Sequence, residues 1–314
     1  MNRMAALKKI LEAKSIPVKN FYLENPSVSA MESIVKSSGS SGTHRKPLWI
    51  LDARDADPGP FLESGSVIAV DNRCSDRRNY ENGGKVTFFD SLPHPDADMK
   101  TVLENMLIDP DLVLLKNKFL QNEKKSGPDE EKKSAFYNKK KSASSNTIKS
   151  QAAESRNILI YSGDIQDTEW LDRAVVSLKK KFSVSSIIRI GIAPVSEKLK
   201  TEMLQFDRLE KEKMYDLLSR ADFIFSYFGM FYFESLYLEK FSYLYRRGEE
   251  GSEHDILSRY FYEKTDLPYI KGAEDFKKID FNLNPAEKRA DIRPSGDGYK
   301  ALVSLILENI EKDT

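Results

Sequence analysis

The stretch from Ala221 to Tyr245 contains the residues whose chemistry is easiest to interpret. An apolar strand is expected to lead through a turn at Gly229 into a helix that carries Glu234, and a second short strand follows. Backbone N–H groups at a helix start favour phosphate, and a carboxylate one turn further on can accept hydrogen bonds from two ribose hydroxyls. The pattern therefore favours a nucleotide or nucleotide-linked ligand, while an ordinary helix-surface role for Glu234 stays open.

Two further acids come directly after predicted strands in the first third of the chain. Leu48–Leu51 leads into Asp52, and Val67–Val70 leads into Asp71. Open α/β sheets bind ligands at the carboxyl ends of their strands, so both acids are candidates for a ligand cleft. Asp also caps and turns the chain at such positions, and this structural role is the competing interpretation.

Strands and helices alternate on both sides of a polar segment. The hydrophobic periodicity predicts helices over residues 3–14, 31–35, 97–108, 170–182, 209–218, 253–264 and 299–310, and strands over residues 18–23, 48–51, 67–70, 86–89, 112–115, 158–161, 184–190 and 241–245. Such alternation is typical of α/β proteins with parallel sheets. We therefore expect two Rossmann-like domains.

Residues 116–157 differ in composition from the rest of the chain. They contain many lysines and serines and few apolar side chains, so they cannot bury enough surface to offset the loss of chain entropy. We expect a disordered linker or insertion there, between an N-terminal Rossmann-like domain at 1–115 and a C-terminal, ligand-binding one at 158–290. A C-terminal helix is expected within residues 291–314.

The composition excludes several classes of protein. The 49 basic and 49 acidic residues balance, so no global charge favours nucleic acid as a partner. One cysteine, Cys74, rules out an internal disulfide framework, and the three histidines, His44, His94 and His254, are far apart, with no zinc-like spacing. No apolar run approaches the roughly 18 residues of a membrane span. We expect a cytoplasmic protein without an integral membrane segment.

The order of these residues resembles the C-terminal half of GT-B nucleotide-sugar proteins. The nearest group is typified by the UDP-sugar hydrolase of pseudaminic acid synthesis and the predicted glycosyltransferases of spore-coat polysaccharide formation. The first strand of that half is followed in the family by a glycine-rich loop, and the later strand by a helix with a Glu and then by a His. The matching residues here are Ser162, Gly163 and Asp164, then Ser226, Gly229, Met230, Glu234, Ser235 and Leu236, and finally His254, Leu257 and Phe261.

The resemblance implies a GT-B-like pair of Rossmann-like domains that face a cleft. It implies that Glu234 takes the ribose hydroxyls, that the backbone at Gly229 and Met230 faces the diphosphate, and that Gly163 lines the cleft. His254 either reaches that cleft or lies on the surface. The activity implied is a nucleotide-sugar-dependent glycosyltransferase or hydrolase of bacterial surface-glycan synthesis, with a UDP- or CMP-linked donor and no metal or other cofactor.

The chain also departs from the family at the expected phosphate site. Phe228 and Ser162 stand where the family has the first glycine of each pair, and Phe231 replaces a Thr. A bulky Phe228 is expected to narrow the phosphate site, because glycine serves there for close backbone approach. The loss of the Thr hydroxyl removes a donor.

The family's opening strand and its G-x-G-H-x-x-R loop, whose His is the general base of the hydrolase, are missing before the helix at 3–14. Either the true start lies upstream of Met1, or the protein has lost its base. Asp52 and Asp71 are then the available substitutes, and the catalytic residue stays unnamed. The alternative function is a non-catalytic GT-B-like binding or scaffold protein; an NAD-type oxidoreductase is disfavoured because no G-x-G-x-x-G follows a strand.

Overall fold

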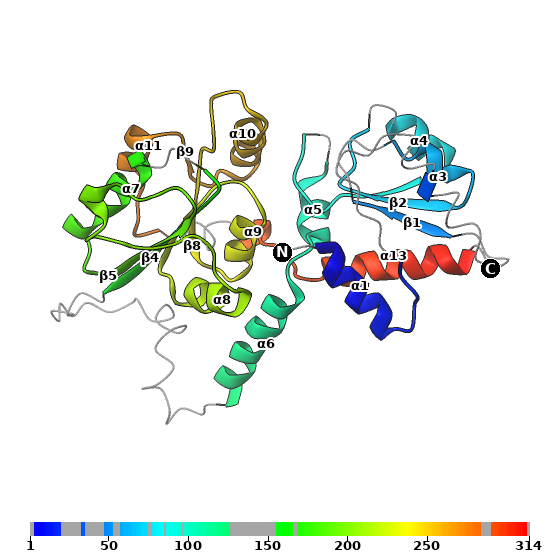
Figure 1. Cartoon of the computed structure of the whole chain (residues 1–314), viewed down its shortest axis with the longest axis horizontal. Coiled ribbons are helices and arrows are strands. Elements are labelled where there is room, and N and C mark those ends of the chain that lie inside the picture. Colours follow the sequence, from blue (N-terminus) through cyan, green and yellow to red (C-terminus); the bar gives the residue numbers. More distant parts are fainter. Residues whose placement is uncertain are drawn as a thin grey trace. The chain divides into compact units, whose positions relative to one another are not determined.

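The computed structural model describes the backbone of residues 3–19, 33–34, 47–52, 57–74, 77–84, 86–95, 97–125, 155–165, 169–283 and 290–312 (Figure 1). The chain divides into two compact units. Unit 1 comprises Met1–Pro110 and Pro294–Thr314, and unit 2 comprises Asp111–Arg293. The last helix of the chain thus belongs to the same unit as the first.

Unit 1 is built on a parallel sheet of β1 (Leu48–Leu51), β2 (Ser66–Val70) and β3 (Val86–Phe89), in that order. In register, Trp49 lies beside Val67 and Val67 beside Val86. The central strand β2 is buried on both faces from Val67 to Val70, as expected for an apolar strand covered by helices on each side.

Two groups of helices cover this sheet (Figure 1). On one face, α1 (Arg3–Ala13) and α13 (Gly298–Lys312) pack their apolar side chains against Ile68 and Val70. On the other face, Phe61 of α3 (Gly59–Leu62) and Tyr80 of α4 (Arg77–Gly83) join Val67 and Ala69. Helix α5 (Met99–Asn105) begins at Asp98, whose carboxylate accepts a hydrogen bond of 3.0 Å from the Thr101 N–H.

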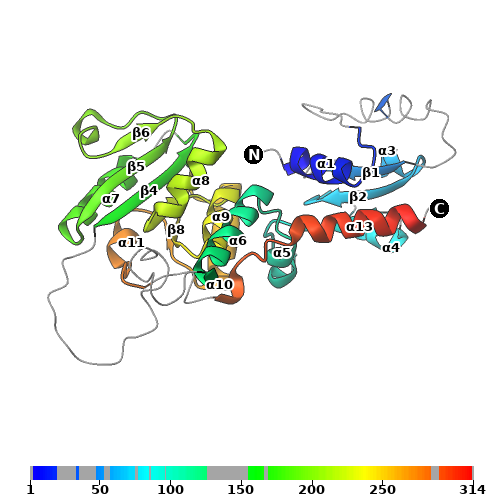
Figure 2. The same cartoon turned by 90° about the horizontal axis from the view of Figure 1, so that it is seen from below.

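Unit 2 contains a six-stranded sheet in which all strands are parallel, in the order β6-β5-β4-β7-β8-β9. Figure 2 shows β6, β5 and β4 side by side. The chain lays down β4, β5 and β6 outward in one direction and then returns to place β7 on the other side of β4. This is the doubly wound strand order, and its reversal point lies between β4 and β7. The strands are β4 (Arg156–Gly163), β5 (Val184–Gly191), β6 (Leu204–Phe206), β7 (Phe223–Ser226), β8 (Phe241–Tyr245) and β9 (Tyr269–Ile270).

Helices connect these strands and cover the sheet of unit 2. Those between strands are α7 (Glu169–Val176), α8 (Lys211–Arg220), α9 (Met230–Tyr237) and α10 (Glu253–Thr265), while α6 (Pro110–Lys125) precedes β4 and α11 (Ala273–Lys278) follows β9. Short 3-10 turns lie at Ser177–Lys180, Glu197–Leu199 and Ala290–Ile292. Within the described ranges, none of the helices is both long and apolar enough to cross a bilayer.

Aromatic side chains dominate the core beneath this sheet. The ring of Phe225 stacks on Tyr243 at 5.3 Å and on Phe276 at 5.6 Å, and Phe281 packs against all three. Phe225 is completely buried. Large aromatic rings bury much apolar area each, so this cluster fixes the strands whose ends form the site described below.

The structure confirms most of the predicted elements and corrects three. The strand predicted at 112–115 is wrong: these residues belong to α6, which also runs past residue 116, where the linker was expected to begin. Four apolar residues alone do not distinguish a strand from a helix, and Pro110 at the start of α6 favours the helix. Val18 and Lys19 are not in a strand. Three predicted segments lie outside the described residues: the rest of that strand, the helix near 31–35 apart from residues 33–34, and residues 126–154 of the linker.

Replacing Phe225 by Ala should destabilise unit 2 by about 3–5 kcal/mol, because the deletion leaves a cavity among rigid rings. The exposed Tyr262 of α10 is a control, and Tyr262→Ala should change stability by less than about 0.5 kcal/mol. Urea unfolding followed by Trp170 fluorescence, in a Trp49→Phe background, measures both. Equal midpoints for the two variants would contradict this account of the core.

Candidate functional site

The reversal point of the unit 2 sheet brings together residues from two distant parts of the chain. Tyr161 of β4 lies in register with Ser226 of β7, so the loops after both strands leave the sheet at the same edge. Six predicted site residues lie in or just after these strand ends: Gly163, Asp164, Ser226, Gly229, Met230 and, one turn into α9, Glu234. A strand-order reversal is where open α/β sheets form a crevice for their ligands.

Gly163 is needed at its position for two reasons. Its φ of +54° is in the left-handed region, which glycine adopts at little cost. A Cβ atom on Gly163 would also lie 2.7 Å from the hydroxyl oxygen of Tyr227. The backbone at this strand end is therefore open to close approach by a neighbouring group.

Helix α9 starts at this edge. Gly229 is its N-cap, in an extended conformation with φ 167°, and its carbonyl accepts a hydrogen bond of 3.0 Å from the Tyr232 N–H. The half-buried Glu234 lies in the second turn. Burial raises the pKa of the Tyr161 hydroxyl, and the carboxylate of Glu234 raises it further. The Glu234 carboxylate is therefore within electrostatic range of Tyr161, which lies near the end of β4.

The two phenylalanines that replace small residues occupy different environments. Phe228 is buried and packs edge-on against Phe233 at 5.4 Å and Phe261 at 6.1 Å. The ring thus lies in the core with α9 and α10, a position that does not favour the prediction that its side chain narrows the phosphate site. Phe231 instead stacks on Tyr161 at 4.3 Å, so a flat aromatic contact stands where a hydroxyl was expected.

The sequence analysis missed Tyr227 and Arg247 at this edge. The guanidinium of Arg247, just after β8, lies 4.7 Å from the centre of the Tyr227 ring and donates hydrogen bonds of 2.9 and 3.2 Å to the Asp164 carboxylate. Burial raises the pKa of Tyr227 to about 12, so its hydroxyl is protonated at neutral pH. Since β8 is the neighbour of β7, the strand-end rule that selected Asp52 and Asp71 would also have selected Arg247.

His254 belongs to the same group. It is the second residue of α10, and its ring meets the Tyr227 ring edge-on at 6.2 Å. Of the two alternatives left open for this histidine, the structure favours a position beside the candidate ligand edge. The side chain is half-buried.

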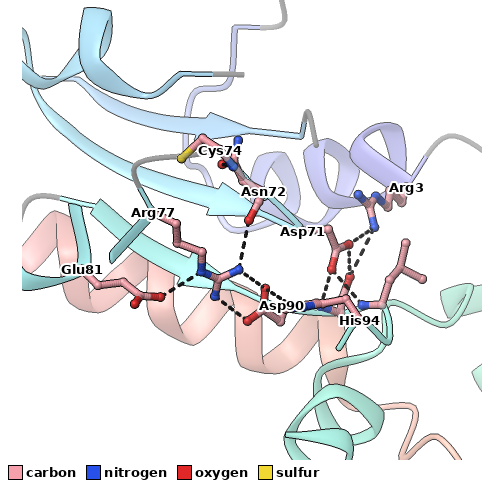
Figure 3. Close-up of polar contacts among 10 residues, drawn as sticks. Arg3, Asp71, Asn72, Cys74, Arg77, Glu81, Asp90 and His94 are labelled. Carbon is pink, nitrogen blue, oxygen red and sulfur yellow. Dashed lines mark hydrogen bonds and ion pairs between the residues drawn. The ribbon is translucent and has the colours of Figure 1, made fainter. Parts of the chain in front are cut away.

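The predicted acids of unit 1 lie at the carboxyl edge of its own sheet, and Figure 3 shows one of them, Asp71, beside Arg3. Asp71 is 2% exposed, has φ +51°, and accepts hydrogen bonds from the Ser91 N–H at 2.6 Å, the Ser91 hydroxyl at 2.7 Å and the Leu92 N–H at 2.8 Å. Arg3 of α1 ion-pairs with Asp71 and also with Asp52, to which its Nε donates at 3.0 Å. Both predicted acids are thus committed to one guanidinium, and Asp71 ties α1 to the loop after β3.

A second ion pair beside this group was missed by the sequence analysis. Arg77 of α4 donates to both oxygens of Asp90, at 2.9 and 2.7 Å, and His94 Nε2 lies 3.3 Å from the same carboxylate. Burial alone would raise the pKa of the Asp90 carboxyl, but the neighbouring His94 imidazole and the hydrogen-bonded Arg77 guanidinium outweigh it and lower the pKa to about 2. Across the described ranges, no three acidic, His or Cys side chains are grouped so as to bind a metal ion.

Comparisons with known proteins give information on the fold. No protein-family model matches the chain. No curated protein matches its sequence. A Listeria monocytogenes protein assigned as a UDP-N-acetylglucosamine 2-epimerase is similar in structure, with a TM-score of 0.50 and 10% identity over 97% of this chain and 87% of that chain.

MurG from Acinetobacter baumannii is similar to the same degree, with a TM-score of 0.50 and 11% identity over 96% of this chain and 88% of that one. At such identities the likeness establishes the fold alone. Together with the two parallel sheets, it shows an α/β protein of GT-B type with two Rossmann-like units.

The Asp90 ion pair predicts acid sensitivity in unit 1. The pKa of the Asp90 carboxyl is about 2, below the value of about 4 for a carboxyl in the unfolded chain. The ionised Asp90 therefore stabilises the folded state fully above pH 4, and this stabilisation is lost as pH falls toward 2. Asp90→Asn should remove on the order of 2 kcal/mol at neutral pH and flatten the decline between pH 4 and 2. Trp49 fluorescence in a Trp170→Phe background reports the unfolding, with the exposed Glu63→Gln as control. An unchanged pH slope in Asp90→Asn would refute this role.

Proposed function

We propose that unit 2 binds a nucleotide-activated sugar, UDP- or CMP-linked, at the edge where β4 and β7 end. The observation that carries this proposal is the convergence of three predicted residues at the strand-order reversal of a doubly wound sheet. Gly229 and Glu234 were selected on chemical grounds, and Gly163 was selected from the family resemblance. Phosphates suit the start of α9, and a ribose diol suits the carboxylate one turn further on.

A buried polar group supports a ligand at this edge. Ser226 ends β7 and is completely buried, and its hydroxyl makes no hydrogen bond to the parts of the chain that the structure describes. Buried hydroxyls are normally paired, because leaving one unpaired costs free energy. A phosphate or sugar oxygen would supply the partner once the side chains that cover the hydroxyl move aside.

The proposed activity is that of a glycosyltransferase or nucleotide-sugar hydrolase in bacterial surface-glycan synthesis, acting in the cytoplasm. Unit 2 would hold the donor and unit 1 would serve the acceptor. The GT-B type of fold supports this class, and one neighbour is assigned to a reaction of a UDP-linked sugar. Donor activation at a helix start would need no metal or other cofactor, because its N–H groups can stabilise the phosphate of the leaving nucleotide, UDP or CMP.

A second candidate is a binding or scaffold protein that has kept the donor site without catalysis. The observation that favours it is in unit 1, where Asp52 and Asp71 are both paired with Arg3. A general base needs a lone pair within reach of the substrate proton, and Asp71 is 2% exposed. Turnover of UDP- and CMP-sugars by a UDP-binding preparation separates the two candidates.

Calorimetric titration with UDP and with CMP tests the donor site. The protein should bind one of them, and Glu234→Gln should weaken binding by roughly ten- to a hundredfold, because hydrogen bonds from a charged acceptor contribute about 1.5–3 kcal/mol. Glu308→Gln is the matched control, an exposed glutamate on α13 of unit 1. Absence of binding, or equal affinity in Glu234→Gln and Glu308→Gln, would overturn the proposal.

A further inference from the structure

One side chain occupies the space between the two glycines of the candidate donor site. A Cβ atom on Gly163 would lie 2.7 Å from the Tyr227 hydroxyl and 3.4 Å from Cε1 of its ring. A Cβ atom on Gly229 would lie 3.6 Å from Cε2 and 3.9 Å from Cδ2, on the opposite edge of the ring. The Tyr227 ring therefore separates the two points at which the backbone is open to close approach.

Neighbouring side chains hold this ring in place. Arg247 covers one face at 4.7 Å, a cation–π contact, and is itself hydrogen-bonded to Asp164. Tyr161 and His254 contact the ring at 5.7 and 6.2 Å between centroids. One of the contacts of Tyr227 is thus made by Arg247, whose ion pair with Asp164 links the loop after β8 to the loop after β4.

The ion pair between Arg247 and Asp164 can be broken at little cost in stability. The Asp164 side chain is 64% exposed and the Arg247 side chain 28% exposed, and exposed pairs contribute little to stability because water and salt screen them. A diphosphate carries more negative charge than one carboxylate, and its oxygens can accept two parallel N–H bonds from a guanidinium. It can therefore take Arg247 away from Asp164.

We propose that Tyr227 is a gate over the donor site and that the Arg247–Asp164 pair is its latch. This inference rests on the proposed function and names its regulation. The ligand that opens the gate is a nucleoside diphosphate or its sugar ester. Its phosphates draw Arg247 from Asp164, the ring loses its cation–π partner, and the space between Gly163 and Gly229 becomes available. A nucleoside without phosphates lacks the charge to release the latch.

Calorimetry with UDP and with uridine, on the full chain, tests the gate. Tyr227→Ala should bind UDP about tenfold more tightly than the parent, since no ring has to be displaced. Asp164→Asn should tighten UDP binding severalfold, because Arg247 is already free for phosphate. When Tyr227→Ala and Asp164→Asn are combined, the gains in UDP affinity should not add. The affinity for uridine should rise in Tyr227→Ala but not in Asp164→Asn. Tyr262→Ala, at an exposed tyrosine of α10, should match the parent.

The outcomes separate the gate from the site itself. The gate is refuted and the donor site stands if the parent binds UDP, Glu234→Gln loses UDP binding, and Tyr227→Ala binds UDP no more tightly than the parent. Weaker UDP binding by Tyr227→Ala would mean that the ring is a ligand contact. If neither the parent nor Tyr227→Ala binds UDP or CMP, the donor site fails and the gate with it. Binding by Tyr227→Ala alone would support both. Thermal unfolding of each variant shows whether it is folded.

Discussion

The arrangement of unit 2 depends on the parallel direction of all its strands. Because every strand points the same way, every loop after a strand leaves the sheet at one edge. The chain returns from β6 to place β7 beside β4, so no helix crosses between the loop after β4 and the loop after β7. This direction places Gly163 and Asp164 at the same edge of the sheet as Gly229, although more than 60 residues separate the two loops. The chemistry at this edge follows from the direction of the strands rather than from local sequence.

Aromatic packing accounts for the way in which this site differs from the family pattern. Where small residues were expected, one phenylalanine, Phe228, is part of the core and the other, Phe231, stacks on Tyr161. The ring of Tyr227 then lies between the glycines that remain. Both glycines and Glu234 lie at this edge, and the guanidinium of Arg247 contacts the Tyr227 ring and the Asp164 carboxylate beside them.

Several features could be predicted from the sequence because they depend on local patterns. Apolar runs such as Val67–Val70 locate strands wherever burial on both faces demands them, and the strand–glycine–helix order located Gly229 and Glu234. Leu112–Leu115 was assigned wrongly because a short apolar run fits a strand and a helix equally well.

Features that depend on contacts between distant residues could not be predicted in this way. The pairing of Arg3 with Asp52 and Asp71 joins α1 to two strand ends, and the ring of Phe228 packs against Phe261 of α10, more than 30 residues away in the chain. Neither contact leaves a periodic signal. Arg247 follows a strand and was within reach of the rule already used, but its role depends on Tyr227 and Asp164, which come from two other strand ends.

Amide hydrogen exchange with and without UDP is the most direct test of the central claim, that the ligand edge is the reversal point of the unit 2 sheet. We expect slower exchange on UDP addition in the segments after β4 and β7, residues 162–165 and 227–234, and no change at the strand ends of unit 1 around Asp71 and Asp90. Protection confined to the unit 1 edge, or no protection at all under conditions where UDP binds, would contradict the account.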